Sequence, residues 1–224
     1  APLCAIIQNT DTRSRDYEEL RRKPRPSHAD YAAFVASGGF REYRGGGHFS
    51  GRLAAPLVFA GAVAKQVLKP RGITVSARIS MLGGVKDPSE SQIEDIVLSA
   101  KQAGDSVGGT IACAVEGMPA GLGAPDFGCN VEGIFSQYLF AVPAVKGVAF
   151  GAGFALASMR GSEANDPFYM DGDTVKTRTN NAGGVNGGIT NGMPINFEAV
   201  LRPTTSIYKE QDTVDLDTME DGKL

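Results

Sequence analysis

The sequence has no tryptophan, only two histidines and only three cysteines among its 224 residues. The cysteines Cys4, Cys113 and Cys129 are odd in number and form no Cys-x-x-Cys pair, which suits a reducing compartment such as the cytoplasm. So few thiols and imidazoles also argue against a structural zinc site, and we expect no bound metal.

Excess charge and long apolar runs are also lacking. The formal net charge is −3, so the chain does not have the positive field that nucleic-acid-binding proteins use. The longest apolar run, residues 53–64, contains Pro56 and Gly61 and is too short to span a bilayer. We therefore expect neither a nucleic-acid partner nor a membrane partner.

The composition is that of a folded protein. Apolar residues make up 42% of the chain and charged residues 21%, which excludes disorder by composition. The 29 glycines are about twice the average share and predict many tight turns or close backbone approaches. We find no internal repeat and no linker, so the simplest prediction is one α+β domain over residues 1–224.

Apolar patterns predict the strands and the helices of this domain. Strands are expected at residues 2–8 (buried, without a charged leader or initiator Met before it), 73–79, 107–115, 145–150, 154–160 and 195–201. Helices are expected at residues 53–68 (central and buried), from the start signal at 87–90 to residue 104, and at 130–142 (amphipathic). The acidic segment from residue 208 onward is expected to be solvated.

Two glycine-rich segments resemble nucleotide-binding motifs without matching them. In the run from Gly46 to Leu53, Arg52 replaces the P-loop lysine and Leu53 replaces the magnesium-binding hydroxyl, which disfavours a nucleoside triphosphatase. The run could still bind an anion through backbone N–H groups and Arg52, or could be an ordinary turn. The segment 151–156 lacks the third glycine of a dinucleotide fingerprint and is better interpreted as a bulged connection between strands.

Three polar loops carry the remaining candidate residues. His28 and His48 lie on loops rich in Arg or Gly. Neighbouring cations would favour the neutral form of each imidazole and a role near an anion. The alternative is a purely structural role. The glycine-rich segment 180–188 either approaches a ligand closely or is a flexible loop. The segment 202–206 offers a cation and hydroxyls at a strand end, and together these loops would suit a phosphorylated ligand.

Several motifs together resemble the chorismate synthase family over essentially the whole chain. In chain order, the motifs are Arg25-Pro26-Ser27-His28-Ala29-Asp30, the Gly45–Arg52 run, Pro119-Ala120-Gly121-Leu122-Gly123, Ala144-Val145-Lys146-Gly147-Val148, Arg160-Gly161-Ser162, Asn181-Ala182-Gly183-Gly184 and Arg202-Pro203-Thr204. The resemblance implies an α+β sandwich with helices packed between antiparallel sheets. It also implies a cytoplasmic homotetramer and a carbon–oxygen lyase that eliminates phosphate from 5-enolpyruvylshikimate 3-phosphate (EPSP) to give chorismate, using reduced FMN (FMNH2) and associated with NADP.

The resemblance also assigns roles to individual residues. His28 resembles the family's catalytic histidine that acts on reduced flavin, and Arg52 resembles a ligand of the substrate phosphate. The residues that align with FMN contacts are His48, Phe49, Ser50, Pro143, Ala144, Gly187, Arg202, Pro203, Thr204, Thr205 and Ser206. His48 and Phe49 stand where the family often has Arg and Ser, and Arg202 stands where Lys is commoner, so a cation or hydrogen-bonding group is largely retained.

Family members are longer at both ends. They begin with a segment that carries a second catalytic histidine and an arginine-rich stretch, and they end in a segment with a catalytic aspartate. The resemblance therefore implies that this chain is an internal part of such an enzyme. Two hypotheses follow, a chorismate synthase core or a catalytically silent core that binds flavin or mediates oligomerisation.

Overall fold

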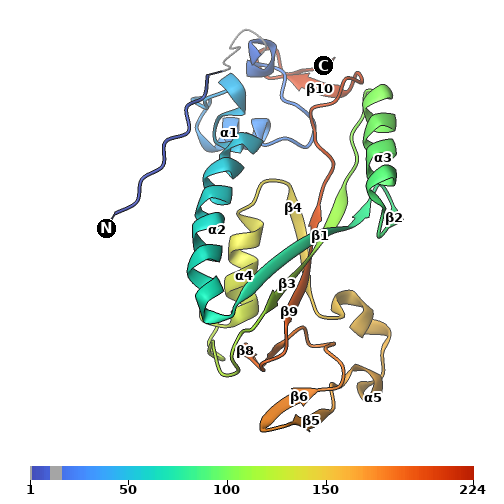
Figure 1. Cartoon of the computed structure of the whole chain (residues 1–224). Helices are drawn as coiled ribbons and strands as arrows, with labels where there is room; N and C mark the ends of the chain where they lie inside the picture. The colour runs from blue at the N-terminus through green and yellow to red at the C-terminus, as the bar shows by residue number, and fades with distance from the viewer. Residues whose placement is uncertain (1, 11–16) are drawn as a thin grey trace. The chain divides into compact units, whose positions relative to one another are not determined.

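The computed structural model describes residues 2–10 and 17–224, and its residues form two compact units (Figure 1). The first unit comprises Ala1–Gly61, Val97–Val107 and Pro203–Leu224, and the second comprises Ala62–Ile96 and Gly108–Arg202. The expectation of one domain over residues 1–224 stays a prediction.

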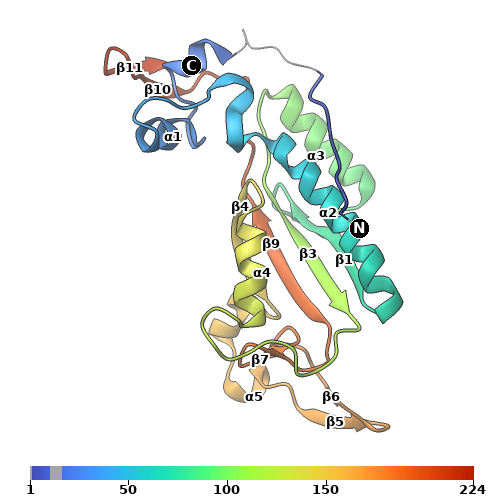
Figure 2. The same ribbon diagram turned by 90° about the vertical axis from the view of Figure 1, so that its left-hand side faces the viewer.

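A five-stranded antiparallel sheet forms the centre of the second unit, with the strand order β2-β1-β3-β9-β4 (Figure 2). Its strands are β1 (Thr74–Leu82), β2 (Val85–Lys86), β3 (Gly109–Glu116), β4 (Val145–Phe150) and β9 (Ile195–Leu201). The strands predicted at 73–79, 107–115, 145–150 and 195–201 are therefore confirmed. Alternating or continuous apolar residues located them because such residues fit a pleated surface with one buried face.

The hydrophobic core lies on one face of this sheet. Val115 pairs with Ile195 across β3 and β9, and Ile195 is completely buried. Phe197, two residues further along β9, points to the same face because side chains alternate along a strand. Its ring lies 5.7 Å from that of Phe135 and 5.6 Å from that of Phe150, in edge-on and tilted geometries that favour aromatic packing.

Two predicted helices are confirmed, and their capping residues are now visible. In α3 (Glu90–Gln102), Ser89 is the cap: its hydroxyl accepts a hydrogen bond from the backbone N–H of Gln92 at 3.3 Å, and its own N–H donates to the Gln92 side chain at 2.9 Å. The helix thus begins later than the Asp87 start signal suggested. The second helix, α4 (Val131–Phe140), supplies Phe135 to the core and lies alongside β4 and β9 (Figure 2).

Helix α2 (Ala54–Leu68) forms as predicted, but the expectation that it is buried is wrong. None of its residues is buried, and Leu57, Val58 and Val67 are 49%, 70% and 53% exposed. A helix that is apolar on all sides tolerates complete burial. The apolar pattern does not show whether another segment covers the helix: Leu68, at its end, packs against the core, whereas most of the helix is exposed.

Two predicted strands do not form. Residues 2–8 are exposed and belong to no strand, because an apolar run becomes a strand only where a neighbouring strand pairs with it. The segment predicted as a strand at 154–160 is instead largely a 3-10 helix, η6 (Gly153–Ser158). Gly153 has a φ of +53°, and the Ala155 N–H donates to the Ala152 carbonyl at 3.0 Å, so the backbone turns instead of extending.

The acidic segment from residue 208 onward is mostly exposed, as expected, but it also forms regular structure with two buried residues. Strands β10 (Asp212–Asp215) and β11 (Glu220–Lys223) form a hairpin. Asp215 and Leu216 are buried. The Asp215 carboxylate pairs with Arg22, and the Leu216 N–H donates to the Arg22 carbonyl at 2.8 Å. The acidic character of the segment could not predict these contacts, because they join residues that are far apart in the sequence.

Short elements complete the two units. In the first unit these are α1 (Asp30–Ala36) and the 3-10 helices η2 (Glu19–Arg21), η3 (Arg44–Phe49) and η4 (Gly51–Leu53). In the second they are η5 (Lys69–Arg71), α5 (Gly161–Ala164) and the hairpins β5 (Phe168–Asp171) with β6 (Thr174–Thr177) and β7 (Val185–Asn186) with β8 (Ile189–Thr190).

The glycine-rich segment 180–188 packs against backbone at the end of β4. The Asn180 side chain holds this segment in place. Its amide oxygen accepts from Gly184 N–H and its NH2 group donates to the Pro194 carbonyl, each at 2.8 Å. Asp166 accepts from Asn181 N–H at 2.7 Å and Ala182 N–H at 2.8 Å. This part of the segment is therefore a fixed turn and not a flexible loop.

Gly151 is expected to be intolerant of a side chain. Its φ is +56°, and a Cβ there would fall against the Asn181 carbonyl oxygen and the Gly183 nitrogen. Gly151→Ala should lower the free energy of unfolding by about 2–4 kcal/mol, through the left-handed backbone and overpacking. The control is Gly161→Ala, where no atom lies within 4 Å of the added Cβ and φ is not positive. Denaturant unfolding should separate the two variants, and equal midpoints would contradict this packing.

Candidate functional site

The expected site residues are distributed over both units. The first unit contains His28, the group His48, Phe49, Ser50 and Arg52, and the segment Pro203–Ser206. The second unit contains Pro143, Ala144, Gly187 and Arg202. The contacts within each unit show which of them the fold brings together.

His28 belongs to a cluster of buried charged side chains in the first unit. Its Nδ1 lies 2.8 Å from Asp30 Oδ1. Arg25 Nε donates to Asp30 Oδ2 at 2.8 Å, and Arg41 Nη1 donates to Oδ1 at 3.2 Å. The side chains of His28, Arg25 and Arg41 are only 11%, 12% and 6% exposed. The cluster therefore holds one carboxylate, two guanidinium groups and one imidazole away from bulk water.

The local sequence explains how these groups meet. Pro24 and Pro26 keep the segment before His28 out of a helix, and Ser27 adopts a φ of +57° that turns the chain. Helix α1 then begins at Asp30 itself, so the carboxylate lies at a helix N-terminus, where negative charge is stabilised. Sequence analysis singled out His28 and missed Asp30 as a site residue, although it lies two residues away in the same motif.

The carboxyl of Asp30 is held in its charged form. Burial opposes its ionisation, but hydrogen bonds from His28 and Arg25 outweigh burial and keep its pKa far below the usual range. The folded state therefore binds fewer protons at Asp30 than the unfolded state does. Its contribution to stability is complete above about pH 4, the usual range of an unfolded Asp, and is lost as the pH falls further.

This linkage predicts a specific acid response. Between pH 7 and pH 3, the free energy of unfolding should fall more steeply in the wild type than in Asp30→Asn, which lacks the titrating group. Urea unfolding at a series of pH values measures both curves. Parallel curves would contradict the assignment of a strongly ionised carboxyl at Asp30.

Two of the predicted loops meet at this cluster. Arg25 Nη1 donates to the Ser206 hydroxyl at 3.0 Å, which links the segment 203–206 to the histidine loop. The Thr204 carbonyl accepts a hydrogen bond from Ser106 Oγ at 2.6 Å, which fixes the same segment from another side. Residues separated by about 180 positions in the sequence thus share one site within the first unit.

The segment that contains His48, Phe49, Ser50 and Arg52 forms two successive 3-10 turns before α2. The Ser50 hydroxyl accepts a hydrogen bond from Arg52 N–H at 3.4 Å and caps η4. Phe49 is half exposed, and His48 and Arg52 are also exposed. Because the glycine run forms 3-10 turns, it does not make the continuous loop-to-helix junction of a P-loop.

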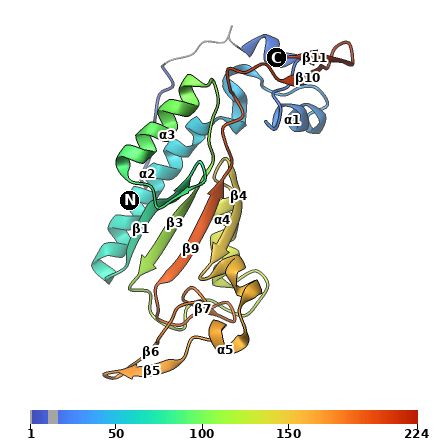
Figure 3. The ribbon, with the colours of Figure 1, turned by 90° about the vertical axis from the view of Figure 1, so that its right-hand side faces the viewer.

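In the second unit, Ala144 and Arg202 are neighbours, whereas Gly187 is distant from both. The Arg202 N–H donates to the Ala144 carbonyl at 3.0 Å, where β4 begins and β9 ends. Gly187 lies in the β7–β8 turn, at the other end of the sheet, where β9 begins (Figure 3). The seven residues of β9 separate the two places by about 20 Å at the usual rise per residue.

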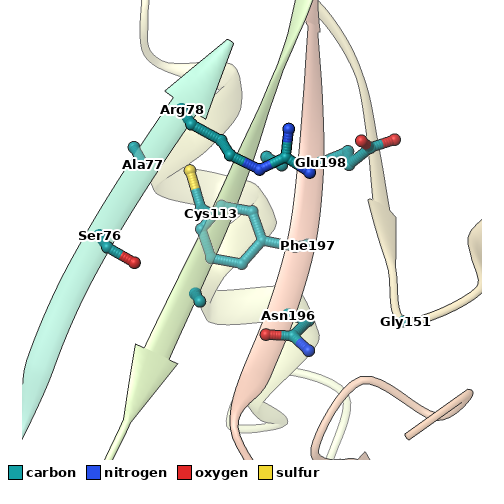
Figure 4. Close-up of a pocket in the computed structure, with 10 residues that line it drawn as sticks. Ser76, Ala77, Arg78, Cys113, Gly151, Asn196, Phe197 and Glu198 are labelled. Carbon is teal, nitrogen blue, oxygen red and sulfur yellow. The ribbon is translucent and has the colours of Figure 1, made fainter. Parts of the chain in front are cut away.

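A shallow hollow of about 460 Å³ lies against the sheet of the second unit (Figure 4). Its lining includes Ser76, Arg78, Cys113, Asn196 and Glu198. Burial raises the pKa of the Cys113 thiol, which keeps it protonated and unreactive. This hollow is lined by none of the residues that the sequence predicts to bind ligand, so it is not the predicted flavin site.

Within residues 2–10 and 17–224, no group of three or more His, Cys, Asp or Glu side chains is placed to hold a metal ion. In the same ranges, no helix has both the length and the apolar character needed to cross a bilayer.

Comparison with known proteins identifies one family. The family model described as chorismate synthase matches residues 1–224. A chorismate synthase of Chitinophaga pinensis is 50% identical over 220 residues, which cover 98% of this chain and 64% of that protein. A chorismate synthase of Thermococcus kodakarensis is 45% identical over 241 residues, which cover 100% of this chain and 68% of that protein.

A solved structure agrees. A chain described as a crystal structure of chorismate synthase superposes with a TM-score of 0.71 at 26% identity and covers 78% of this chain and 63% of that one. This likeness confirms the predicted α+β fold with helices and antiparallel sheets. The chain spans about two thirds of the length of the curated relatives it matches.

Proposed function

Because this chain belongs to the chorismate synthase family, we propose that it carries the core of a chorismate synthase. The reaction is the 1,4-anti elimination of phosphate from EPSP to give chorismate, with reduced FMN required and no net oxidation or reduction. The protein is a carbon–oxygen lyase of the shikimate pathway and works in the cytoplasm as a homotetramer, and the family's association with NADP applies to it. The match of the family model over residues 1–224 carries this proposal.

The polar cluster of the first unit fits an anionic ligand such as reduced FMN. In this cluster, Arg41 Nε is buried with no hydrogen-bond acceptor among the residues that the structure describes. A buried donor without a partner is costly, so an acceptor at this position would stabilise the cluster. A phosphate or an anionic flavin ring offers such acceptors.

Individual residues receive the following roles in the proposal. His28 is the catalytic residue, and Arg52 binds the substrate phosphate. FMN is held by His48, Phe49, Ser50, Pro143, Ala144, Gly187, Arg202, Pro203, Thr204, Thr205 and Ser206. Since Gly187 lies far from Ala144 and Arg202 in one chain, we assign its flavin contact to a second copy in the tetramer.

The chemistry divides between the flavin and this chain. When bound, reduced FMN supplies electron density to the allylic system as the C–O bond to phosphate breaks. His28 exchanges a proton with the flavin, a task suited to imidazole because its charge changes closest to neutral pH. Arg52 supplies positive charge where the departing phosphate becomes more negative, and a cation fixed in advance stabilises the transition state more than the ground state.

An anaerobic assay with reduced FMN and EPSP tests the proposal. Release of phosphate together with chorismate would support it, and FMN titrations with and without EPSP would show whether binding is coupled. A protein that binds neither flavin nor EPSP would contradict it.

A catalytically silent core is the second candidate function. It is favoured by one observation, that the chain covers 64% of the Chitinophaga relative. Such a core would bind FMN or associate into oligomers without turning over EPSP. FMN binding without release of phosphate in the same assay would select this candidate.

Replacing Arg202 with Ala should weaken FMN binding by about 1–3 kcal/mol, the range for losing a hydrogen bond to a charged group. The matched control is Arg71→Ala, because Arg71 is an exposed arginine of the second unit outside every predicted site loop. Fluorescence titration with FMN measures both variants. Equal affinities would remove Arg202 from the flavin site.

A further inference from the structure

Asp30 uses both carboxylate oxygens to organise the cluster around His28. Oδ1 lies 2.8 Å from His28 Nδ1, and Arg25 Nη2 and Arg41 Nη1 both donate to it at 3.2 Å. Oδ2 accepts from Arg25 Nε at 2.8 Å and from the Arg25 backbone N–H at 3.1 Å. Asp30 is only 3% exposed, so these protein donors take the place of water around the carboxylate.

The charges around the imidazole determine which ring nitrogen carries the proton. A carboxylate oxygen only accepts, so His28 Nδ1 must donate to Asp30 Oδ1. Arg25 Nη2 lies 3.1 Å from Nδ1 and 3.2 Å from Nε2, and a guanidinium only donates. Since Nη2 is almost equally far from the two ring nitrogens, it lies beside the ring and not along the outward direction of the Nε2 lone pair.

We propose that Asp30 is a positioning residue that fixes His28 in the Nδ1–H tautomer and leaves Nε2 as the nitrogen that exchanges a proton with the ligand. The ring is then oriented by a buried anion, as carboxylates orient imidazoles in other catalytic sites. The effect of this tautomer on turnover rests on the function proposed above, whereas the tautomer itself is a property of this chain alone.

The same carboxylate also positions the segment 203–206. Arg25 is held by Asp30 through Nε and the backbone N–H, which leaves Nη1 directed at the Ser206 hydroxyl at 3.0 Å. Asp30 thus fixes both the imidazole and one of the predicted flavin contacts. A single carboxylate sets the geometry of two loops that are remote in sequence.

Asp30→Asn tests the proposal directly, because the oxygen and the NH2 group of the amide must occupy different positions, whereas the two carboxylate oxygens are equivalent. Both oxygen positions face two arginine donors, but those at Oδ2 are closer (2.8 and 3.1 Å) than those at Oδ1 (3.2 Å each). The amide oxygen should therefore occupy the Oδ2 position, and the NH2 group should face His28. That NH2 group can only donate, so His28 Nδ1 must then accept, and the proton must move to Nε2. The variant should therefore invert the tautomer, not merely loosen the ring.

Long-range ¹H–¹⁵N correlation spectra report the tautomer of each imidazole directly. The chain has two histidines, so His48 gives an internal reference in every spectrum. At about pH 8.5, where an ordinary imidazole is neutral, His28 of the wild type should show a protonated Nδ1 and an unprotonated Nε2. In Asp30→Asn the assignment should reverse, while His48 stays unchanged.

Asp215→Asn is the matched control, because Asp215 is another buried carboxylate of the first unit, paired with Arg22. It should leave the His28 spectrum as in the wild type. A proton on Nε2 in the wild type would overturn the proposal without any variant. An unchanged tautomer in folded Asp30→Asn would overturn it as well.

FMN titration separates this proposal from the proposed function. If both hold, Asp30→Asn should bind FMN about tenfold more weakly, the effect of losing one hydrogen bond to a charged group. If the tautomer inverts but the wild type binds no FMN, the positioning role is supported and the proposed function is overturned. Equal FMN affinity in both proteins with an unchanged tautomer would overturn the positioning role alone.

Discussion

His28→Ala is expected to lower turnover of EPSP by about 10²–10⁴-fold, the usual range for losing a general acid or base. The fold should survive, because Asp30 keeps Arg25 and Arg41 as partners when the imidazole is removed. The loss of one hydrogen bond in the cluster should cost about 1 kcal/mol of stability. Anaerobic turnover at saturating reduced FMN and thermal unfolding of the same samples measure the two effects.

Two outcomes would return His28 to a structural role. One is turnover equal to that of the wild type. The other is a large loss of thermal stability, with turnover reduced only in proportion to the unfolded fraction. Either would mean that the imidazole serves the buried Asp30 and not a ligand.

Phe197→Ala should lower the free energy of unfolding by about 3–5 kcal/mol, the range for truncating a buried Phe. Phe197 is 7% exposed, and its ring contacts those of Phe135 and Phe150 at the centre of the second unit's core. The truncation removes both ring contacts and leaves a cavity between a strand and a helix that cannot close completely. Urea unfolding followed by far-UV circular dichroism measures the loss.

Val200→Ala is the control for this prediction, since Val200 lies on the same strand but is 43% exposed. It should change the free energy of unfolding by less than about 1 kcal/mol. Similar losses in the two variants would mean that the aromatic cluster is not the centre of the core.

The sequence located elements whose own residues decide their structure. The strand at 195–201 and the helix around 131–140 appear where apolar periodicity predicted them, because burial of one face selects residues at that period. The strand predicted at 154–160 was wrong, because the apolar residues there do not alternate and Gly153 turns the backbone. The strand predicted at 2–8 was wrong, because a strand needs a neighbouring strand to pair with and the local sequence does not show whether one is present.

The candidate site divides in the same way. The motif around His28 identified the imidazole, and the polar strand end at 202–206 identified a partner loop. The link between them, Arg25 to Ser206, could not be predicted, because it joins residues far apart in the chain. The role of Asp30 likewise needed the structure, since only the hydrogen-bond directions show that it organises both loops.

The first unit is assembled from three stretches of chain, and this sets the order in which the protein can mature during synthesis. Contacts such as Thr213 Oγ1 to the Pro24 carbonyl and Lys209 to Asp105 tie residues made last to residues made long before. The sheet of the second unit can be completed once β9, its last strand in the sequence, has left the ribosome. The histidine loop must wait for the residues beyond 203, so a nascent chain paused before that point would carry a finished sheet and an unfinished site.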